Sequence, residues 1–151
     1  MLKVIPVTTE GLTRFKKEKE DLLEKRKGAV ISLRTAREMG DLSENAAYKV
    51  ARMELSGIDA RLRKLEYIIR FSKIIENTDH SKVGFETKVK IESEGKILEF
   101  TVVGGYESNP SQGKISHMSP LGRALFGRRA GEEINVVTPQ GIKKYKLISI
   151  A

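Results

Sequence analysis

The stretch "GDLSENAAY", residues 40–48, decides the fold, because it separates two long helical patterns by only a few residues. Before it, from Thr8 to Met39, the chain has no proline, and its seam positions recur at alternating spacings of three and four. This spacing is the heptad pattern of a coiled coil, here with two charged interruptions. The seam positions are Leu12, Phe15, Lys19, Leu22, Arg26, Ala29, Leu33 and Ala36.

Both ends of this first helix carry residues that typically cap or end a helix. The hydroxyl of Thr8 or Thr9 can cap the unpaired amides of the first turn, and Gly40 stands where a left-handed residue would end the helix. A second helix is predicted from Leu42 or Ser43 to Ile75, because two adjoining lines of apolar or small residues run along it. One line is Ala46, Val50, Met53, Gly57 and Ala60, and the other is Leu55, Ile58, Leu62, Leu65 and Ile69.

The short connection makes the two helices fold back on each other, which predicts an antiparallel α-helical hairpin with Asp41 at its tip. Large apolar residues gather at the opposite end of the hairpin, and we expect them to form a base that packs against other parts of the chain. These residues are Leu65, Ile68, Ile69, Phe71, Ile74 and Ile75.

The rest of the chain alternates like β-strands. Residues 86–93 and 96–104 predict one β-hairpin, and residues 132–138 and 142–150 predict another. Between them, Ser119 can cap a short helix with Pro120 at its first position. The predicted fold class is α+β: a coiled-coil hairpin domain over residues 1–76, a linker over 77–82, and a small antiparallel β-sheet domain with a short helix over 83–151.

Composition narrows the classes of function. The 151 residues include 28 basic and 20 acidic side chains, for a net charge of +8. This balance suits contact with nucleic acid or an acidic protein surface, and equally a surface that charge keeps soluble. No stretch approaches the roughly 18 apolar residues of a membrane span, and the N-terminus lacks the apolar core of a signal peptide. We expect a cytoplasmic protein with no membrane partner.

Several kinds of catalytic site are not expected. The chain has no cysteine and only two histidines, His80 and His117, which show no ligand spacing and are predicted to lie on the surface. No nucleophilic triad order, phosphate-binding glycine loop or dinucleotide fingerprint is present. The sequence therefore does not indicate an independent enzyme.

The acidic residues of the tip, Asp41 and Glu44, have two interpretations. Their spacing is that of a capping box, in which each side chain bonds to the backbone amide of the other, whereas Ser43 as the cap would release both carboxylates. Two carboxylates at the end of a long slender rod could also bind Mg²⁺, but they supply only part of its six-ligand shell. They would bind the ion only where another molecule completes the site.

Basic and aromatic residues follow the acids on both helices. Arg34 and Arg37, and likewise Lys49 and Arg52, recur at a spacing of three and could contact phosphates. They could instead be solvated flanks of the coiled coil that pair with Glu38 and Glu54. Tyr48 lies one turn beyond Glu44, where its ring could stack on a base or simply cover the seam.

Three stretches, in this order, resemble the Gre family of bacterial transcript cleavage factors, closest to the GreA type. They are "IPVT" before the first helix, "AREMGDLSENAAY" at the tip, and "ISHMSPLGRALFGRRAGEEINVVTPQG" near the C-terminus. The similarity spans nearly the whole chain. It implies an N-terminal antiparallel coiled coil and a C-terminal domain of the FKBP type, without evident prolyl isomerase function.

The resemblance also implies partners and roles. The C-terminal domain would dock at the rim of the RNA polymerase secondary channel, and the coiled coil would pass down the channel to the catalytic centre. There Asp41 and Glu44 would hold a Mg²⁺ shared with polymerase, which itself cleaves the backtracked RNA 3′ end. The protein would act as a monomer and bind no metal independently. Candidate RNA contacts are Arg37, Arg52, Lys49 and Tyr48, and candidate docking residues are Ser119, Pro120, Leu121, Gly122 and Arg123.

Two other activities remain open at this point. The same fold could belong to a paralogue that occludes the channel and inhibits polymerase, although such a rod needs no paired metal ligands. The chain could also be a coiled-coil adaptor or RNA-binding module that does not use the tip acids. This chain departs from the family in its net charge, which is basic, whereas typical members are acidic. The surface that contacts RNA or polymerase would then be more strongly charged or differently placed.

Overall fold

The computed structural model describes residues 3–41 and 44–151, and it divides into two compact units. One unit consists of Leu12–Ser72, and the other combines the N-terminal segment up to Gly11 with Lys73–Ala151. The first residues of the chain therefore pack with the C-terminal part, although the sequence pattern groups them with the hairpin. The predicted linker, residues 77–82, lies inside the second unit.

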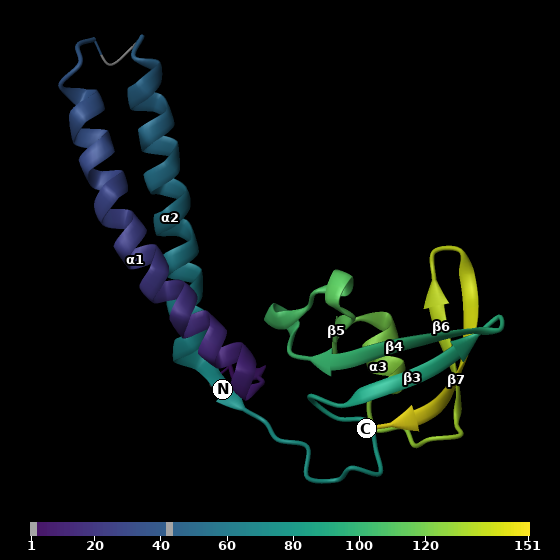
Figure 1. Cartoon of the computed structure of the whole chain (residues 1–151). Helices are drawn as coiled ribbons and strands as arrows, with labels where there is room; N and C mark the ends of the chain where they lie inside the picture. The colour runs from purple at the N-terminus through teal and green to yellow at the C-terminus, as the bar shows by residue number, and fades with distance from the viewer. Residues whose placement is uncertain (1–2, 42–43) are drawn as a thin grey trace. The chain divides into compact units, whose positions relative to one another are not determined.

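The first unit is the predicted helical hairpin, made of α1 (Thr9–Arg37) from Leu12 onward and of α2 (Ala46–Phe71) (Figure 1). All eight predicted seam positions of α1 are buried or half-buried, which confirms the heptad assignment. A core cluster joins Ala29 of α1 to Ile58 and Leu62 of α2. No helix in the described part of the chain is long and apolar enough to cross a membrane.

Ion pairs between the helices explain the charged seam positions. Arg26 Nε lies 2.6 Å from Asp59 Oδ1, and Lys19 Nζ lies 3.9 Å from Glu66 Oε1. A third pair joins Arg61 to Glu18 at 2.6 Å. The hydrogen bonds from Arg26 and Arg61 lower the pKa of the Asp59 and Glu18 carboxyl groups below their ordinary values. These charged side chains thus form ion pairs between the two helices, and the charged seam positions do not disrupt the packing of the hairpin.

The second helix differs from its prediction in three ways. It begins at Ala46, later than Leu42 or Ser43, and ends at Phe71, before Ile75. Only one of its two apolar lines is buried, because two helices alone cover a single narrow seam. The line from Ala46 to Ala60 is exposed throughout, whereas the buried residues are Ala51, Ile58, Leu62, Leu65 and Ile68.

The predicted base of the hairpin is partly helix and partly strand. Leu65 and Ile68 are fully buried, as expected. Beyond Phe71 the chain becomes β2 (Ser72–Ile74), which pairs with β1 (Ile5–Val7), and Ile75 N donates to Val7 O at 3.3 Å. The helix prediction fails here because a partner strand from the N-terminus, invisible to local periodicity, offers backbone hydrogen bonds.

The second unit contains a five-stranded sheet in the order β5-β4-β3-β7-β6 (Figure 1). The strands are β3 (Lys88–Ser93), β4 (Lys96–Val103), β5 (Lys114–Ser116), β6 (Glu133–Thr138) and β7 (Gly141–Ile150). Both predicted β-hairpins are present. The sheet is mixed, because β5 pairs parallel to β4 after a crossover loop that holds two short 3-10 turns, η1 (Gly105–Glu107) and η2 (Pro110–Gln112).

One face of this sheet is covered by the predicted short helix, α3 (Pro120–Leu125). Leu125 joins the buried core with Ile91, Val102 and Leu147. His80 is exposed, as predicted, but His117 is half-buried, with its ring centroid 4.9 Å from that of Phe85. The prediction for His117 is wrong because an aromatic partner from a distant segment covers the imidazole.

Candidate functional site

Asn45 sets the geometry of the hairpin end. It is the N-cap of α2, and its side-chain oxygen accepts from Tyr48 N at 3.0 Å. Its amide nitrogen also donates to the carbonyl of Ala36, near the end of α1, at 2.7 Å. One side chain thus caps one helix and holds the end of the other. Asn45, and not Asp41, is the N-cap; the alternative cap, Ser43, lies outside the described residues.

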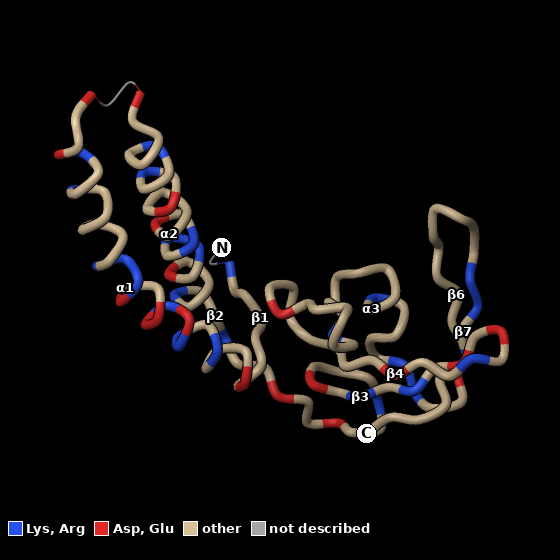
Figure 2. Tube along the Cα trace, turned by 45° about the horizontal axis from the view of Figure 1, so that its top comes forward, with Lys and Arg blue, Asp and Glu red and all other residues tan. Residues whose placement is uncertain are grey.

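Both tip acids lie in the connection between the helices, and both are exposed. Gly40, just before Asp41, has a φ of +126°, a value that favours glycine, but it is not the residue that ends α1, so that prediction is wrong. It lies three residues beyond the end of α1, because the helix stops at Arg37 and not at Met39. Figure 2 shows acidic positions on both arms of the hairpin at this end. Basic positions follow them along α2.

The predicted RNA-contacting residues surround this end. Arg37 closes α1, and its guanidinium carbon lies 5.9 Å from the ring centroid of the half-buried Tyr48. Lys49 and Arg52 are exposed on α2. In the described part of the chain no ion pair ties these cations to Glu38 or Glu54. The structure therefore brings Arg37 and Tyr48 together and leaves the two α2 cations exposed to solvent.

Carboxylates are the metal-ligand type that the hairpin end offers. Residues 3–41 and 44–151 contain no group of three or more His, Cys, Asp or Glu side chains that could hold a metal. Asp41 and Glu44 offer two carboxylates, which are hard oxygen ligands of the kind Mg²⁺ prefers. Two carboxylates can complete a shell to which another molecule contributes.

The predicted docking segment mixes structural and exposed residues. Ser119 Oγ caps α3 by accepting from Gly122 N at 3.0 Å, as its sequence position predicts. Gly122 is buried, and a Cβ there would lie 1.9 Å from Ser116 O. Leu121 packs against the core, whereas Pro120 and Arg123 are exposed. Pro120 and Arg123 are therefore the most accessible side chains of the predicted segment.

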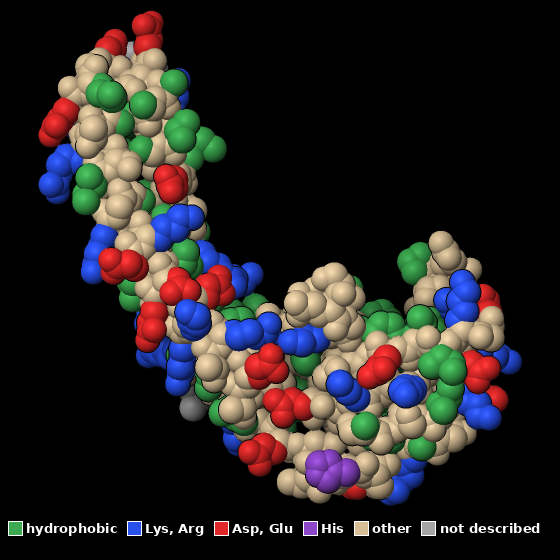
Figure 3. Space-filling model, in the orientation of Figure 1, with side chains coloured by type: hydrophobic (Ala, Val, Ile, Leu, Met, Phe, Trp, Pro, Cys, Tyr) green, Lys and Arg blue, Asp and Glu red, His purple; other side chains and the backbone are tan. Residues whose placement is uncertain are grey.

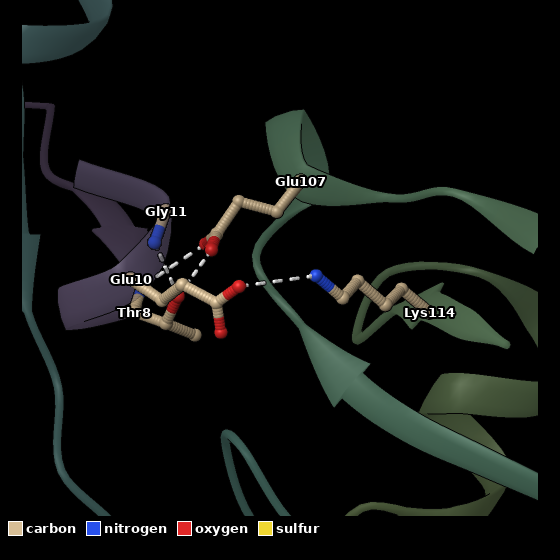
Figure 4. A network of polar contacts seen from close by, with 5 residues as sticks. All are labelled: Thr8, Glu10, Gly11, Glu107 and Lys114. Atoms are coloured by element: carbon tan, nitrogen blue, oxygen red, sulfur yellow. Dashed lines mark hydrogen bonds and ion pairs between the residues drawn. The ribbon is translucent and has the colours of Figure 1, made fainter. Parts of the chain in front are cut away.

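Sequence reasoning missed a buried carboxylate that binds the N-terminal segment (Figure 4). Glu107, only 4% exposed, accepts from Thr8 N at 3.0 Å and from the Thr8 hydroxyl. The same hydroxyl caps α1 by accepting from Gly11 N at 2.9 Å, and Lys114 pairs with Glu10 at 3.7 Å. Glu107 is 99 residues from Thr8 in the chain, so no local pattern indicates the contact.

Fold and site together define a class of protein: a two-helix arm that carries exposed acids and cations at its end, joined to a small mixed-sheet unit. Two family models match the chain. The model described as the N-terminal part of a transcription elongation factor covers residues 5–74, and the model described as the C-terminal part of GreA/GreB covers residues 78–151. The chain belongs to the GreA/GreB family of transcription elongation factors.

Two relatives named GreA agree with this assignment. Transcription elongation factor GreA of Thermomicrobium roseum is 39% identical over 150 residues, which cover 97% of this chain and 96% of the relative. The GreA of a Nitratiruptor species is 41% identical, with 96% and 91% covered. Among solved structures, the GreA factor homolog 1 (Gfh1) of Thermus thermophilus is 28% identical, with a TM-score of 0.48 and 99% of each chain covered.

Proposed function

We propose that this protein is a transcript cleavage factor that enters the secondary channel of RNA polymerase and stimulates the polymerase's own hydrolysis of backtracked RNA. The observation that carries the proposal is the placement of Asp41 and Glu44, two exposed carboxylates, at the end of a two-helix arm. An arm of 26 to 29 residues per helix is about 40 Å long at roughly 1.5 Å per residue. It can deliver its end deep into a partner.

The residues of the hairpin end would have different roles, in metal binding, phosphate binding and base stacking. Asp41 and Glu44 would complete the ligand shell of a Mg²⁺ that polymerase holds in part, and the ion supplies Lewis-acid stabilisation of the attacking water and the leaving oxygen. Arg37, Lys49 and Arg52 would bind phosphates of the extruded RNA 3′ end. Tyr48, held beside the Arg37 guanidinium, would present its ring to a base.

Docking would use the second unit. Pro120 and Arg123 are the exposed members of the predicted segment and would contact the channel rim. Ser119, Leu121 and Gly122 would act indirectly, because their cap, core contact and close approach hold the segment in place.

The test is cleavage by purified polymerase that has been stalled and backtracked. With this protein and Mg²⁺ we expect shortened transcripts that can be extended again. Asp41→Ala or Glu44→Ala should lower the cleavage rate by at least roughly tenfold to a hundredfold, which is the loss that removing an outer-shell partner of a metal already causes. Glu38→Ala, which removes an exposed acid just before the tip, is the matched control and should leave the rate unchanged.

The other outcomes separate the rival activities. Equal cleavage with wild type, Asp41→Ala and Glu44→Ala would refute the role of the tip acids. Inhibition of polymerase without cleavage would indicate a factor that occludes the channel. Tight binding of RNA in the absence of polymerase, with no effect on cleavage, would indicate a separate RNA-binding module.

A further inference from the structure

An apolar groove runs between the two helices close to the hairpin end. It has a volume of about 560 Å³. Its lining includes Ile31, Thr35 and Met39 of the first helix and its C-terminal end, and Ala47, Val50 and Glu54 of the second helix. We call it the distal groove. It lies on the hairpin itself and is separate from the tip acids.

The lining leaves large apolar side chains in water. Ile31 is 62% exposed, Met39 is 70% exposed and Val50 is 65% exposed, and the neighbouring Met53 is 74% exposed. Figure 3 shows hydrophobic side chains gathered over this part of α1 and α2. Val50 and Met53 belong to the apolar line of α2 that its partner helix does not cover. Grouped exposed apolar residues of this kind usually mark an interaction surface.

Charge separates the distal groove from the cationic residues of the hairpin end. Arg37, Lys49 and Arg52 do not line it, whereas the exposed carboxylate of Glu54 does. In the described part of the chain Glu54 has no ion-pair partner. Glu54 is the only charged side chain among the described lining residues, and its carboxylate disfavours a phosphate backbone and favours a protein segment with a positive charge.

The shape of the groove favours a helix. Two packed helices form a furrow into which a third helix fits, as in helical bundles. Small residues, Ala36, Ala47 and Ala51, lie within the furrow and allow close approach of another backbone. Aliphatic side chains at its edges can then contact an apolar helix face at helical spacing.

We propose that the distal groove binds an amphipathic α-helix of RNA polymerase, which packs aliphatic side chains against Ile31 and Val50 and directs a Lys or Arg toward Glu54. The inference rests on the proposed function, because it assigns the groove to the same partner. It adds a contact that uses neither the tip acids nor the β-sheet unit. The groove would hold the arm laterally while its other surfaces contact RNA.

The first test measures affinity for purified polymerase core by competition fluorescence. Ile31→Ser combined with Val50→Ser should weaken binding roughly tenfold to a hundredfold, as truncation of central apolar contacts does at other interfaces. Leu23→Ser is the matched control, because Leu23 is an exposed leucine (44%) of α1 outside the groove. The double variant should keep a melting temperature close to that of wild type, since Ile31 and Val50 are mostly exposed. Equal affinity of the double variant and wild type would overturn the inference.

Charge reversal tests the stated chemistry of the partner. Glu54→Lys should weaken binding more than Glu54→Gln, and the difference between the two variants should shrink as salt is raised. If Glu54→Lys binds as well as Glu54→Gln at low salt, the partner does not present a cation there.

Site-specific cross-linking identifies the occupant. The chain has no cysteine, so Val50→Cys gives a unique thiol for a photoactivatable group, with Leu23→Cys as the control. With a backtracked complex of purified polymerase and RNA, the expected adduct is a helical polymerase peptide that carries aliphatic residues and a Lys or Arg. Adducts only with RNA, or sedimentation of the free wild-type protein as a dimer that Val50→Ser abolishes, would overturn the proposal.

The two proposals fail in different ways. If wild-type protein neither binds polymerase nor stimulates cleavage, the proposed function fails and the groove inference fails with it. If wild type binds and stimulates cleavage but the serine variants match it in affinity and cross-linking, only the groove inference is refuted.

Discussion

The buried contact between Thr8 and Glu107 makes a quantitative prediction. Thr8→Val removes a hydrogen bond to a charged group in a buried site, which costs about 1.5–3 kcal/mol. It also removes the hydroxyl that caps α1 at Gly11 N, a loss of about 0.5–2 kcal/mol. The local stability should therefore fall by about 2–5 kcal/mol. Thr8→Ser, the matched control, keeps the hydroxyl and should cost less than about 1 kcal/mol.

Native-state hydrogen exchange measures this effect where it occurs. A loss of 2–5 kcal/mol should speed exchange of the Gly11 amide roughly thirtyfold to several thousandfold, because about 1.4 kcal/mol corresponds to a factor of ten. Glu107→Gln combined with Thr8→Val should be less destabilising than the sum of the two single changes, since both break the same contact. If Thr8→Val exchanges at the Thr8→Ser rate, the contact does not stabilise the start of α1.

Glycines in α1 and α2 lead to a second prediction: a Cβ at Gly28 or Gly57 would meet nothing within 4 Å, so changing either helix-interior glycine to alanine should raise the unfolding free energy by about 0.5–1 kcal/mol in urea. Gly11→Ala is the contrast within the same helix, because its Cβ would lie 1.8 Å from Glu107 Oε1, and it should destabilise; the reverse ranking would refute the reasoning. A third prediction concerns acid. The pKa values of Glu18 and Asp59 are lowered by hydrogen bonds from Arg61 and Arg26, so their contribution is present above the ordinary carboxyl range and is lost as the pH falls below about 4. Urea unfolding should therefore depend less on pH, between about 5 and 2.5, in Glu18→Gln with Asp59→Asn than in wild type; identical slopes would contradict the assignment.

Local patterns predicted what local physics determines. The heptad spacing of α1 places every seam position correctly, including Lys19 and Arg26, whose charges pair across the hairpin. The turn at Glu94 and Gly95, both with positive φ, and the Ser119 cap of α3 follow equally from short-range signals. These features depend on residues a few positions apart.

The predictions that are wrong concern two kinds of residue. Some contact a segment that is distant in the chain, and others compete with a neighbouring residue for the same capping role. Residues 72–74 form a strand because Ile5–Val7 pairs with them. Asn45 replaces Asp41 as the cap because it can also reach the carbonyl of Ala36. The outward line of α2 could be recognised only by noting that a two-helix hairpin has one interface. The metal, RNA and docking roles remain predictions, since they depend on molecules outside this chain.

The Glu107 contact has a consequence for dissecting the protein into fragments. The β-sheet unit is completed by residues 3–11, which are its most remote in sequence. A fragment that starts near residue 78 would retain Glu107 but lack Thr8, and its carboxylate would lose both donors. Fusing residues 3–11 ahead of such a fragment through a flexible tether would restore them. Recombinant halves intended for separate assays are therefore best divided after Gly11 and after Ser72, where the two units meet in the chain, and not at the apparent linker.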